Sequence, residues 1–292
     1  MVSGCTPCSP GCERCWALAM EKRFYHGPQE RGIGGIVGPN RKTVFGNIQI
    51  HPERLDIPLR RKKPTVWAVW NDLFHEDVPD DFIMRVFDSM PTDFLQPCKH
   101  TYLILTKRVK RMHQFFDERT RYGTRPWTNV WLGVTVCNQE EADQKIPLLL
   151  QIPAAVRWVS IEPMLGAADL LLPGKNFTFS IAWGSQATLI INQNIHWVVL
   201  GGETGPGARP MHPDWVRSVR DQCQAAQVPF FFKQWGEWAW SESPEMEVFR
   251  RLDRFKLYRF KEDGTCMYRI GRKAAGRLLD GREWNELPEE KS

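Results

Sequence analysis

The 292-residue chain lacks any apolar run of the roughly 18 residues that a membrane span requires. No apolar signal segment stands at its start, and no short-period repeat of the solenoid kind recurs along it. Apolar residues make up 42% of the chain and charged residues 25%, which is ordinary for a globular protein. We therefore expect a cytoplasmic protein with no membrane partner, built as one large domain or as one domain with an appendage.

Cysteines, in contrast, are concentrated in one place. Four of them fall within eleven residues, and the last three have the spacing Cys-x3-Cys-x2-Cys. Thiolates this close on a short loop can converge on one inorganic centre. Three thiolates on a four-iron cluster leave one iron without a protein ligand, free to take a small molecule. The predicted metal ligands are Cys5, Cys8, Cys12 and Cys15.

Three other interpretations of these cysteines stay open. A disulfide framework is disfavoured because thiols of an intracellular protein remain reduced. Structural zinc is the stronger rival, although such sites usually separate their two cysteine pairs by about a dozen residues or more. Here only three residues separate Cys8 from Cys12. A closed four-cysteine iron–sulfur centre for electron transfer is the third, and the rest of the chain is large for a mere carrier. The remaining cysteines are expected to be small buried hydrophobes: Cys98, Cys137, Cys223 and Cys266.

Short apolar runs recur along the chain, each followed by a polar loop and a helical pattern. Strands are expected at Thr65–Trp70, Thr101–Thr106, Asn129–Val136, Arg157–Ile161, His196–Leu200 and Pro229–Lys233. Helices are expected at Asp80–Ser89, Val109–Glu118, Gln139–Gln151 and Pro213–Gln227. Strands that alternate with helices indicate parallel βα units. Together with a first strand near Gly46–Ile50, they predict an α/β fold, a partial (βα)6–7 TIM-like barrel.

Several segments interrupt this alternation. The N-terminal Cys-rich loop is followed by a helix-like stretch at Ala17–Phe24, and Gly27–Arg41 has the composition of a long loop. Leu172–Gln193 is expected to be an insertion with its own strand pair. Two antiparallel strands, Phe255–Phe260 and Cys266–Ile270, flank an Asp-Gly turn. The predicted domains are a barrel over residues 1–238, including the Cys-rich loop, and a small, basic, β-containing C-terminal appendage over residues 239–292.

Polar side chains follow almost every expected strand. In parallel βα barrels the active site lies at the carboxyl ends of the strands, so these side chains would face one mouth. Glu162 and Glu203 are favoured as functional because each follows an otherwise apolar strand, whereas His75 is expected to be a helix cap or part of a salt bridge at the barrel rim. The glycine-rich stretch after Leu200 can bring backbone amides close to a ligand. The strand-end residues of interest are Asn71, Asp72, Lys107, Arg108, Thr135, Ser160, Glu162, Glu203, Arg209, Lys233, Gln234 and Trp235.

Positive charge is spread unevenly. The net charge is only +5, yet residues 249–277 hold ten basic and three acidic residues. Such a stripe could contact phosphates, or it could be the solvated face of a β-hairpin. Trp235, Trp238 and Trp240 cluster just before it. Their rings could stack on a base, although packing in the core is the default for tryptophan.

An ordered set of motifs links the cysteines to these strand ends. It comprises Gly4-Cys5-Thr6, Ser9-Pro10-Gly11-Cys12-x-x-Cys15, Asp72-Leu73-Phe74-His75-Glu76, Leu105-Thr106-Lys107-Arg108, Ser160-Ile161-Glu162-Pro163, Gly201-Gly202-Glu203 and Phe232-Lys233-Gln234-Trp235-Gly236. With this set the chain resembles the radical S-adenosylmethionine (SAM) superfamily. More closely, it resembles a phage-associated family of unknown function placed near that superfamily.

The resemblance departs from the usual pattern in three respects. The phage-associated family places its cysteines at Cys5, Cys12 and Cys15, whereas the superfamily spacing selects Cys8, Cys12 and Cys15. Both sets are present, so the third ligand is either Cys5 or Cys8. The superfamily also carries an aromatic residue where Arg14 stands. Its methionine-binding Gly-Gly-Glu motif follows an early strand, so the late one at residues 201–203 is not equated with it.

The resemblance implies a [4Fe-4S] cluster held by three thiolates, with SAM as the second cofactor. Asn71 or Asp72 would bind the methionyl amine of SAM, and Thr135 or Glu162 its ribose hydroxyls, with Glu203 also on the cofactor side. Glu162 and Lys233 are the predicted catalytic residues. The predicted substrate-binding residues are Arg209, Lys233, Gln234 and Trp235.

The implied partners are an external one-electron donor of the flavodoxin or ferredoxin type and a DNA or RNA substrate, modified at a base or nucleotide. A second hypothesis, from another class, is a zinc-stabilised barrel that binds nucleic acid or protein without catalysing a reaction.

Overall fold

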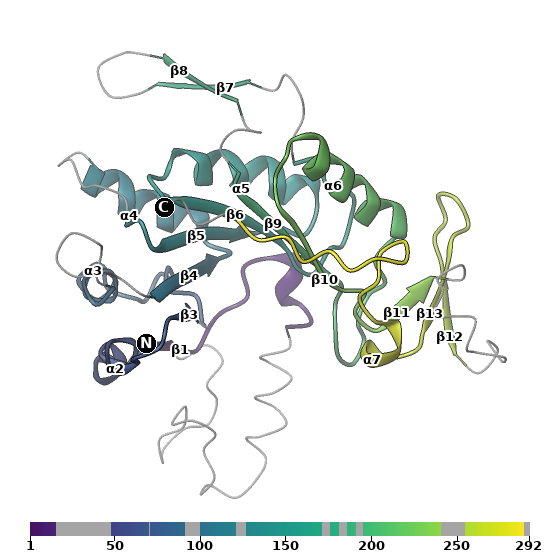
Figure 1. Cartoon of the computed structure of the whole chain (residues 1–292), viewed down its shortest axis with the longest axis horizontal. Coiled ribbons are helices and arrows are strands. Elements are labelled where there is room, and N and C mark those ends of the chain that lie inside the picture. The colour runs from purple at the N-terminus through teal and green to yellow at the C-terminus, as the bar shows by residue number, and fades with distance from the viewer. Residues whose placement is uncertain are drawn as a thin grey trace, which may run out of the picture. The chain divides into compact units, whose positions relative to one another are not determined.

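Parallel strands and helices alternate through the middle of the chain (Figure 1). The computed structural model describes residues 1–15, 48–69, 71–90, 100–120, 127–170, 176–180, 186–190, 195–240 and 255–288. The expected helix at Ala17–Phe24, the loop at Gly27–Arg41, Trp70 and Cys98 lie outside these residues. None of the described helices is long and apolar enough to cross a membrane.

Six strands form the main sheet. They are β3 (Thr65–Ala68), β4 (His100–Thr106), β5 (Val130–Thr135), β6 (Val156–Ile161), β9 (Trp197–Gly201) and β10 (Phe230–Gln234). Their order across the sheet is β10-β9-β6-β5-β4-β3, so the strands follow one another as they do along the chain. The pairings of β3 with β4, β4 with β5, β6 with β9 and β9 with β10 are parallel. This unreversed parallel order confirms the α/β class and is consistent with a partial barrel.

Helices stand between these strands where the sequence predicts them. They are α3 (Asp80–Asp88), α4 (Val109–Thr120), α5 (Gln139–Gln151) and α6 (Pro213–Ala225). The side chain of His212 begins α6 by accepting a hydrogen bond from the Asp214 N–H, and Pro213 occupies its first turn. Val216, Val219 and Cys223 form the buried face of α6. The apolar periodicity of the sequence therefore locates all four helices.

The chain divides into two compact units, Met1–Val134 with Gln151–Val156, and Thr135–Leu150 with Arg157–Ser292. The core of the first unit is aromatic. Phe74, Phe87, Phe115 and Phe116 make edge-on or stacked ring contacts with centroids 5.3–6.4 Å apart. These rings join the segment after β3 to α3 and α4, which fixes the position of the polar residues at the ends of β3 and β4.

The strand expected near Gly46–Ile50 does not join the main sheet. Its described part, β2 (Gln49–Ile50), pairs antiparallel with β1 (Val2–Ser3) in a separate two-stranded sheet. The short β2 ends where Pro52 begins a 3-10 turn, η2 (Pro52–Arg54), followed by the short α2 (Ile57–Arg60). Interpreting β2 as a first barrel strand was therefore wrong.

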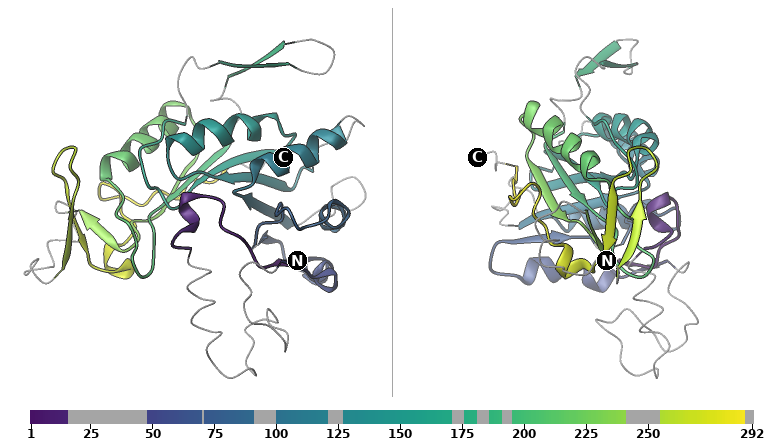
Figure 2. Two further views of the ribbon diagram at one scale, coloured as in Figure 1. Left: turned by 180° about the vertical axis from the view of Figure 1, so that it is seen from behind. Right: turned by 90° about the vertical axis from the view of Figure 1, so that its right-hand side faces the viewer.

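Two antiparallel additions belong to the second unit. β7 (Asn176–Ser180) pairs with β8 (Gln186–Ile190), which confirms the strand pair expected within Leu172–Gln193. At the C-terminal side, β11 (Trp238–Trp240), β13 (Cys266–Arg269) and β12 (Lys256–Arg259) form a three-stranded sheet in that order, followed by α7 (Arg272–Ala275) (Figure 2). The hairpin around Gly264 is confirmed, and the predicted boundary between residues 238 and 239 falls inside β11.

Candidate functional site

Arg108 fastens the N-terminal segment to the carboxyl ends of β3 and β4. It follows β4 directly and is buried. Its Nη2 donates to the carbonyl oxygen of Thr6 at 2.8 Å and to Thr6 Oγ1 at 2.7 Å. Its Nη1 lies 3.1 Å from Asp72 Oδ2, and its Nε lies 2.8 Å from Glu76 Oε2. One guanidinium thus binds the loop of cysteines and two strand-end carboxylates.

The Asp72 carboxylate organises the end of β4 beside Arg108. Its Oδ1 accepts hydrogen bonds from Thr106 Oγ1 at 2.5 Å and from the Phe74 N–H at 3.1 Å, and its Oδ2 accepts one from the Lys107 N–H at 3.3 Å. Only 8% of this side chain is exposed. The neighbouring Asn71 Nδ2 donates to the carbonyl oxygen of Val2 at 3.1 Å. Both predicted SAM-amine ligands therefore also hold this part of the fold together.

His75 makes a further hydrogen bond with the Thr6 side chain. Its Nδ1 accepts a hydrogen bond from the Asp77 N–H at 3.1 Å, so in the neutral ring the proton resides on Nε2. Nε2 then donates to Thr6 Oγ1, 2.7 Å away. The ring is buried, with 3% exposed. His75 caps a turn and not a helix, because the next described helix, α3, begins only at Asp80. It also holds Thr6 of the cysteine loop.

The cysteine sulfurs lie near the positive charges of Arg108 and Lys107. A 3-10 turn, η1 (Pro10–Cys12), begins at Ser9, whose Oγ accepts from the Gly11 N–H at 3.3 Å. Cys5 Sγ lies 3.9 Å from Arg108 Nη1, and the Cys15 N–H donates to the carbonyl oxygen of Cys12 at 3.2 Å. In the described part of the chain no three cysteine sulfurs lie within 4.8 Å of one another.

The electrostatics single out Cys12 as a thiolate. Its pKa is lowered to about 5, chiefly because its sulfur accepts a hydrogen bond from the Cys8 thiol, with backbone N–H groups and the charge of Lys107 adding to the effect. The pKa of Cys8 is raised, because the same bond holds its proton and the thiol is partly buried. Burial and the Asp72 charge raise the pKa of Cys5. Cys8 and Cys12 therefore share one proton, and ligation of a metal by Cys12 stays a prediction.

In the second unit, Glu162 and Lys233 come together. Lys233 Nζ lies 2.9 Å from Glu162, whose peptide bond to Pro163 is cis. The two residues extend from β6 and β10, the neighbours of β9, so their ion pair crosses the end of β9 at Gly201. A Cβ at Gly201 would lie 3.3 Å from Glu162 Oε1. Because Gly201 has no side chain, it leaves room for the Glu162–Lys233 ion pair. Of the Lys233 side chain, 52% stays exposed.

Both carboxylate oxygens of Glu203 accept hydrogen bonds from Arg209. Arg209 donates from its backbone N–H and its Nε to Glu203 Oε2, at 2.8 and 2.9 Å, and from Nη2 to Oε1 at 2.6 Å. Glu203 is buried, with 5% exposed. The predicted cofactor residue and the predicted substrate residue therefore hold each other and shape the loop of residues 201–209.

Backbone-to-backbone packing links this loop to the end of β10. The Gly202 N–H donates to the Gln234 carbonyl oxygen at 2.9 Å, and the Glu237 N–H donates to the Glu203 carbonyl oxygen at 3.2 Å. A Cβ at Gly202 would lie 2.1 Å from the Trp235 carbonyl oxygen. Gly236 has φ +83°, and a Cβ there would lie 2.2 Å from the Glu203 carbonyl oxygen. Only glycine fits at either position.

The structure buries Trp235, with 2% exposed. Its ring stacks on Trp240 and meets Phe232 edge-on, and its Nε1 donates to the Leu278 carbonyl oxygen at 2.7 Å. The ring is therefore packed in the core, the default expectation for tryptophan, and contact of Trp235 with a substrate stays a prediction. Thr135 is buried as well, with 1% exposed, and its carbonyl oxygen accepts from Lys145 Nζ at 3.0 Å. Contact of Thr135 with a ribose stays a prediction.

The matching family model covers residues 1–288 and describes a protein of unknown function, DUF5131. This chain belongs to the DUF5131 family. No curated protein and no solved structure matches it significantly.

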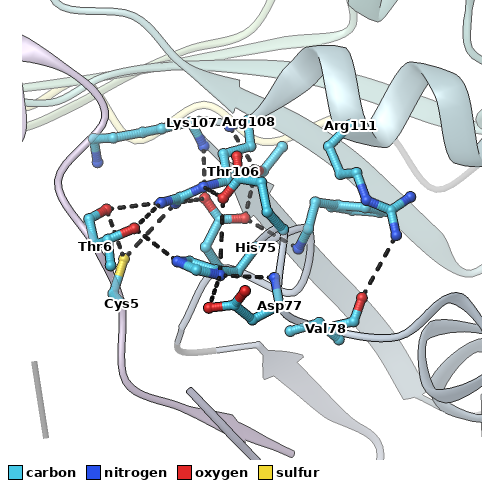
Figure 3. A network of polar contacts seen from close by, with 12 residues as sticks. Cys5, Thr6, His75, Asp77, Val78, Thr106, Lys107, Arg108 and Arg111 are labelled. Carbon is cyan, nitrogen blue, oxygen red and sulfur yellow. Dashed lines mark hydrogen bonds and ion pairs between the residues drawn. The ribbon is translucent and has the colours of Figure 1, made fainter. Parts of the chain in front are cut away.

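Sequence reasoning about this DUF5131 member missed the roles of Arg108, Thr6 and His75. Lys107 and Arg108 did carry a signal, because two adjacent cations directly after a buried strand are unusual in a sheet core. Nothing in the sequence, however, indicated that residue 108 would bind residue 6. That contact exists only because the N-terminal segment folds back onto the end of β4 (Figure 3).

Proposed function

We propose that this protein is a radical SAM enzyme with a TIM-like partial barrel, acting on a nucleic-acid base or nucleotide. The observation that carries the proposal is the loop of four cysteines fastened by Arg108 to the ends of β3 and β4. It unites a stabilised thiolate, further sulfurs and a buried cation within one strand-end network. The DUF5131 family is one of unknown function, so the proposal is based on the chemistry of this network.

The residues fit an iron–sulfur cluster in both ligand type and charge. Cys12 and Cys15, with either Cys5 or Cys8, are the proposed thiolate ligands of a [4Fe-4S] cluster. A cluster with three thiolates is negatively charged, and Arg108 and Lys107 lie where their positive charges would offset it. When bound, such a cluster would supply the one-electron reduction that cleaves SAM into methionine and a 5′-deoxyadenosyl group able to take hydrogen from the substrate, with the electron coming from an external flavodoxin- or ferredoxin-type donor.

The strand-end residues supply binding and positioning. Arg108, Thr6 and His75 hold the cysteine loop in place. Asn71 and Asp72 are proposed for the methionyl amine, since a carboxylate and an amide oxygen can both accept its hydrogen bonds. Thr135 and Glu162 are proposed for the ribose hydroxyls. Glu203 is proposed to shape the cofactor side through its pairing with Arg209.

The Glu162–Lys233 pair is proposed to meet the substrate. Its ammonium group is half-exposed and can hold a phosphate or carboxylate, and its carboxylate can accept a proton from the reacting group. Gln234 is proposed to hydrogen-bond the substrate beside it.

The test is anaerobic purification followed by iron, sulfide and zinc analysis, then reduction with dithionite in the presence of SAM. We expect about four irons per chain and release of 5′-deoxyadenosine. Cys12→Ala should abolish both, and Cys266→Ala, a cysteine in β13, should abolish neither. One zinc per chain with no SAM cleavage would instead support the zinc-stabilised binding protein. The contact between the Cys8 and Cys12 sulfurs is the observation in favour of that second candidate.

A further inference from the structure

The β12–β13 hairpin carries more positive charge than its described carboxylate contacts neutralise, since of its arginines Arg269 lies 4.0 Å from Glu237. Residues 255–277 hold seven basic and two acidic residues. Lys256, Arg259 and Lys261 are exposed, and none of the three makes a described ion pair. Of the two acids, Asp263 is engaged with His212, 3.0 Å away. The hairpin therefore presents cations that are free to bind an anionic partner.

One face of the hairpin combines Arg259 with apolar surface. Leu257 pairs with Tyr268 across the ladder, and Arg259 with Cys266, so these four side chains lie on one face. Lys256 and Tyr258 lie on the other face, where Tyr258 contacts Phe260 and Trp238. Leu257 is 47% exposed although large and apolar. A sheet face that holds apolar side chains next to Arg259, with exposed Lys256 and Lys261 elsewhere on the same hairpin, suits nucleic acid, because bases pack on apolar side chains and phosphates pair with cations.

The base of this hairpin is bonded to the loop that follows β9. Arg269 Nη2 donates to the Gly205 carbonyl oxygen at 2.9 Å, and the Gly205 N–H donates to Glu237 Oε1 at 3.0 Å. The Ile270 and Gly271 N–H groups both donate to the Glu237 carbonyl oxygen, at 3.1 and 3.0 Å. The hairpin therefore stands beside the strand-end loop that contains Glu203, within one compact unit.

We propose that the β12–β13 hairpin binds the sugar–phosphate backbone of a nucleic acid and presents it to the strand-end loop 201–209. This inference deepens the proposed function, because it gives the nucleic-acid substrate a docking surface, and it rests on that function. Binding itself requires neither cluster nor SAM, so the two proposals can fail separately.

The experiment measures fluorescence anisotropy of labelled 20-nucleotide single-stranded DNA, single-stranded RNA and duplex DNA over a series of salt concentrations. The test variant is Lys256→Glu/Arg259→Glu/Lys261→Glu. The control variant is Lys62→Glu/Lys63→Glu/Lys110→Glu, which changes three exposed cations of the first unit by the same charge. Circular dichroism melting checks that both variants fold.

We expect salt-dependent binding by the wild-type chain and by the control. The hairpin variant should bind at least about tenfold more weakly at low salt, and its log–log salt slope should fall by about 2 to 3, roughly one for each phosphate that it no longer binds. The three probes identify which nucleic acid binds best. Absence of wild-type binding to all three would overturn the proposal, as would equal weakening in the two variants. Binding of polyglutamate as tightly as nucleic acid at the same salt concentration would also overturn the proposal, since the hairpin would then be a surface for acidic proteins.

Discussion

Arg108 Nη2 donates to both the carbonyl oxygen and the Oγ1 of Thr6, a residue 102 positions earlier in the chain. The Arg108 guanidinium also forms ion pairs with Asp72 and Glu76. These pairs hold it in position independently of the cysteine loop. The cysteine loop is thus bound to a preformed part of the fold. A metal site that begins on such a loop loses less conformational freedom on binding than one on a free segment.

Arg108→Ala should lower the free energy of unfolding by about 3–5 kcal/mol, because it leaves the buried Asp72 carboxylate without its partner. Urea denaturation measures the loss. The metal content per chain after anaerobic purification should fall at the same time. Arg111→Ala is the control, since Arg111 pairs with the more exposed Asp80. Unchanged metal content in a folded Arg108→Ala protein would contradict the anchoring role.

The hydrogen bond between His75 and Thr6 should appear in a double-mutant cycle. Thr6→Val and His75→Phe each remove one partner of the buried contact. We expect a coupling free energy of about 1 kcal/mol in urea denaturation. Additive losses would indicate that the two side chains act independently.

Substitution of the strand-end glycines should separate a steric effect from a conformational one. Gly202→Ala and Gly236→Ala drive a Cβ into a carbonyl oxygen and should each cost about 3 kcal/mol or more of unfolding free energy, or prevent folding. Gly264 also has positive φ, but no atom lies within 4 Å of its Cβ position. Gly264→Ala should therefore cost only about 1 kcal/mol. Thermal and urea denaturation of the three variants provide the comparison, and equal losses would refute the close approach.

Stability should fall as the pH rises above 9, in part through Cys223. Burial, with a smaller contribution from the Glu286 charge, raises the pKa of its thiol from 9 to about 12. Between these values the unfolded chain loses the proton while the folded chain keeps it, so ionisation favours unfolding. Cys223→Ala should flatten the dependence of unfolding free energy on pH between 9 and 12. Cys266→Ala, at a half-exposed position, should leave the slope unchanged. A wild-type slope in Cys223→Ala would show that other groups account for it.

Glu162→Gln and Lys233→Met should affect turnover far more than stability. The pair is partly exposed, so each substitution should change the unfolding free energy by no more than about 1 kcal/mol. If the pair meets the substrate, SAM cleavage without substrate should persist, while substrate-dependent turnover falls by about a hundredfold, as for loss of a general acid–base group. Full substrate turnover in both variants would remove Glu162 and Lys233 from the mechanism.

The strands and helices of the main sheet could be predicted because each depends on local pattern. β4 and α5 begin and end within one residue of their expected limits, since apolar runs and helical periodicity are properties of consecutive residues. β2 was misplaced because a two-residue pairing with β1 leaves no such pattern.

The candidate site could be predicted only in part. Parallel topology correctly brought Glu162 and Lys233 to the same end of the sheet, on the two strands that flank β9. The role of Arg108 and the burial of Trp235 depend on contacts with Thr6 and Leu278, which are distant in sequence. Such contacts arise from tertiary packing and are invisible to periodicity or spacing.

The close approach of Gly202 to the Trp235 carbonyl group has a further consequence for how this part of the molecule can change. With no side chains to slide or rotate between them, the segments after β9 and β10 must shift together, as one rigid piece. Length differences among relatives are therefore expected at the turn around Gly264, where a Cβ would meet no atom within 4 Å, and not where these two segments touch.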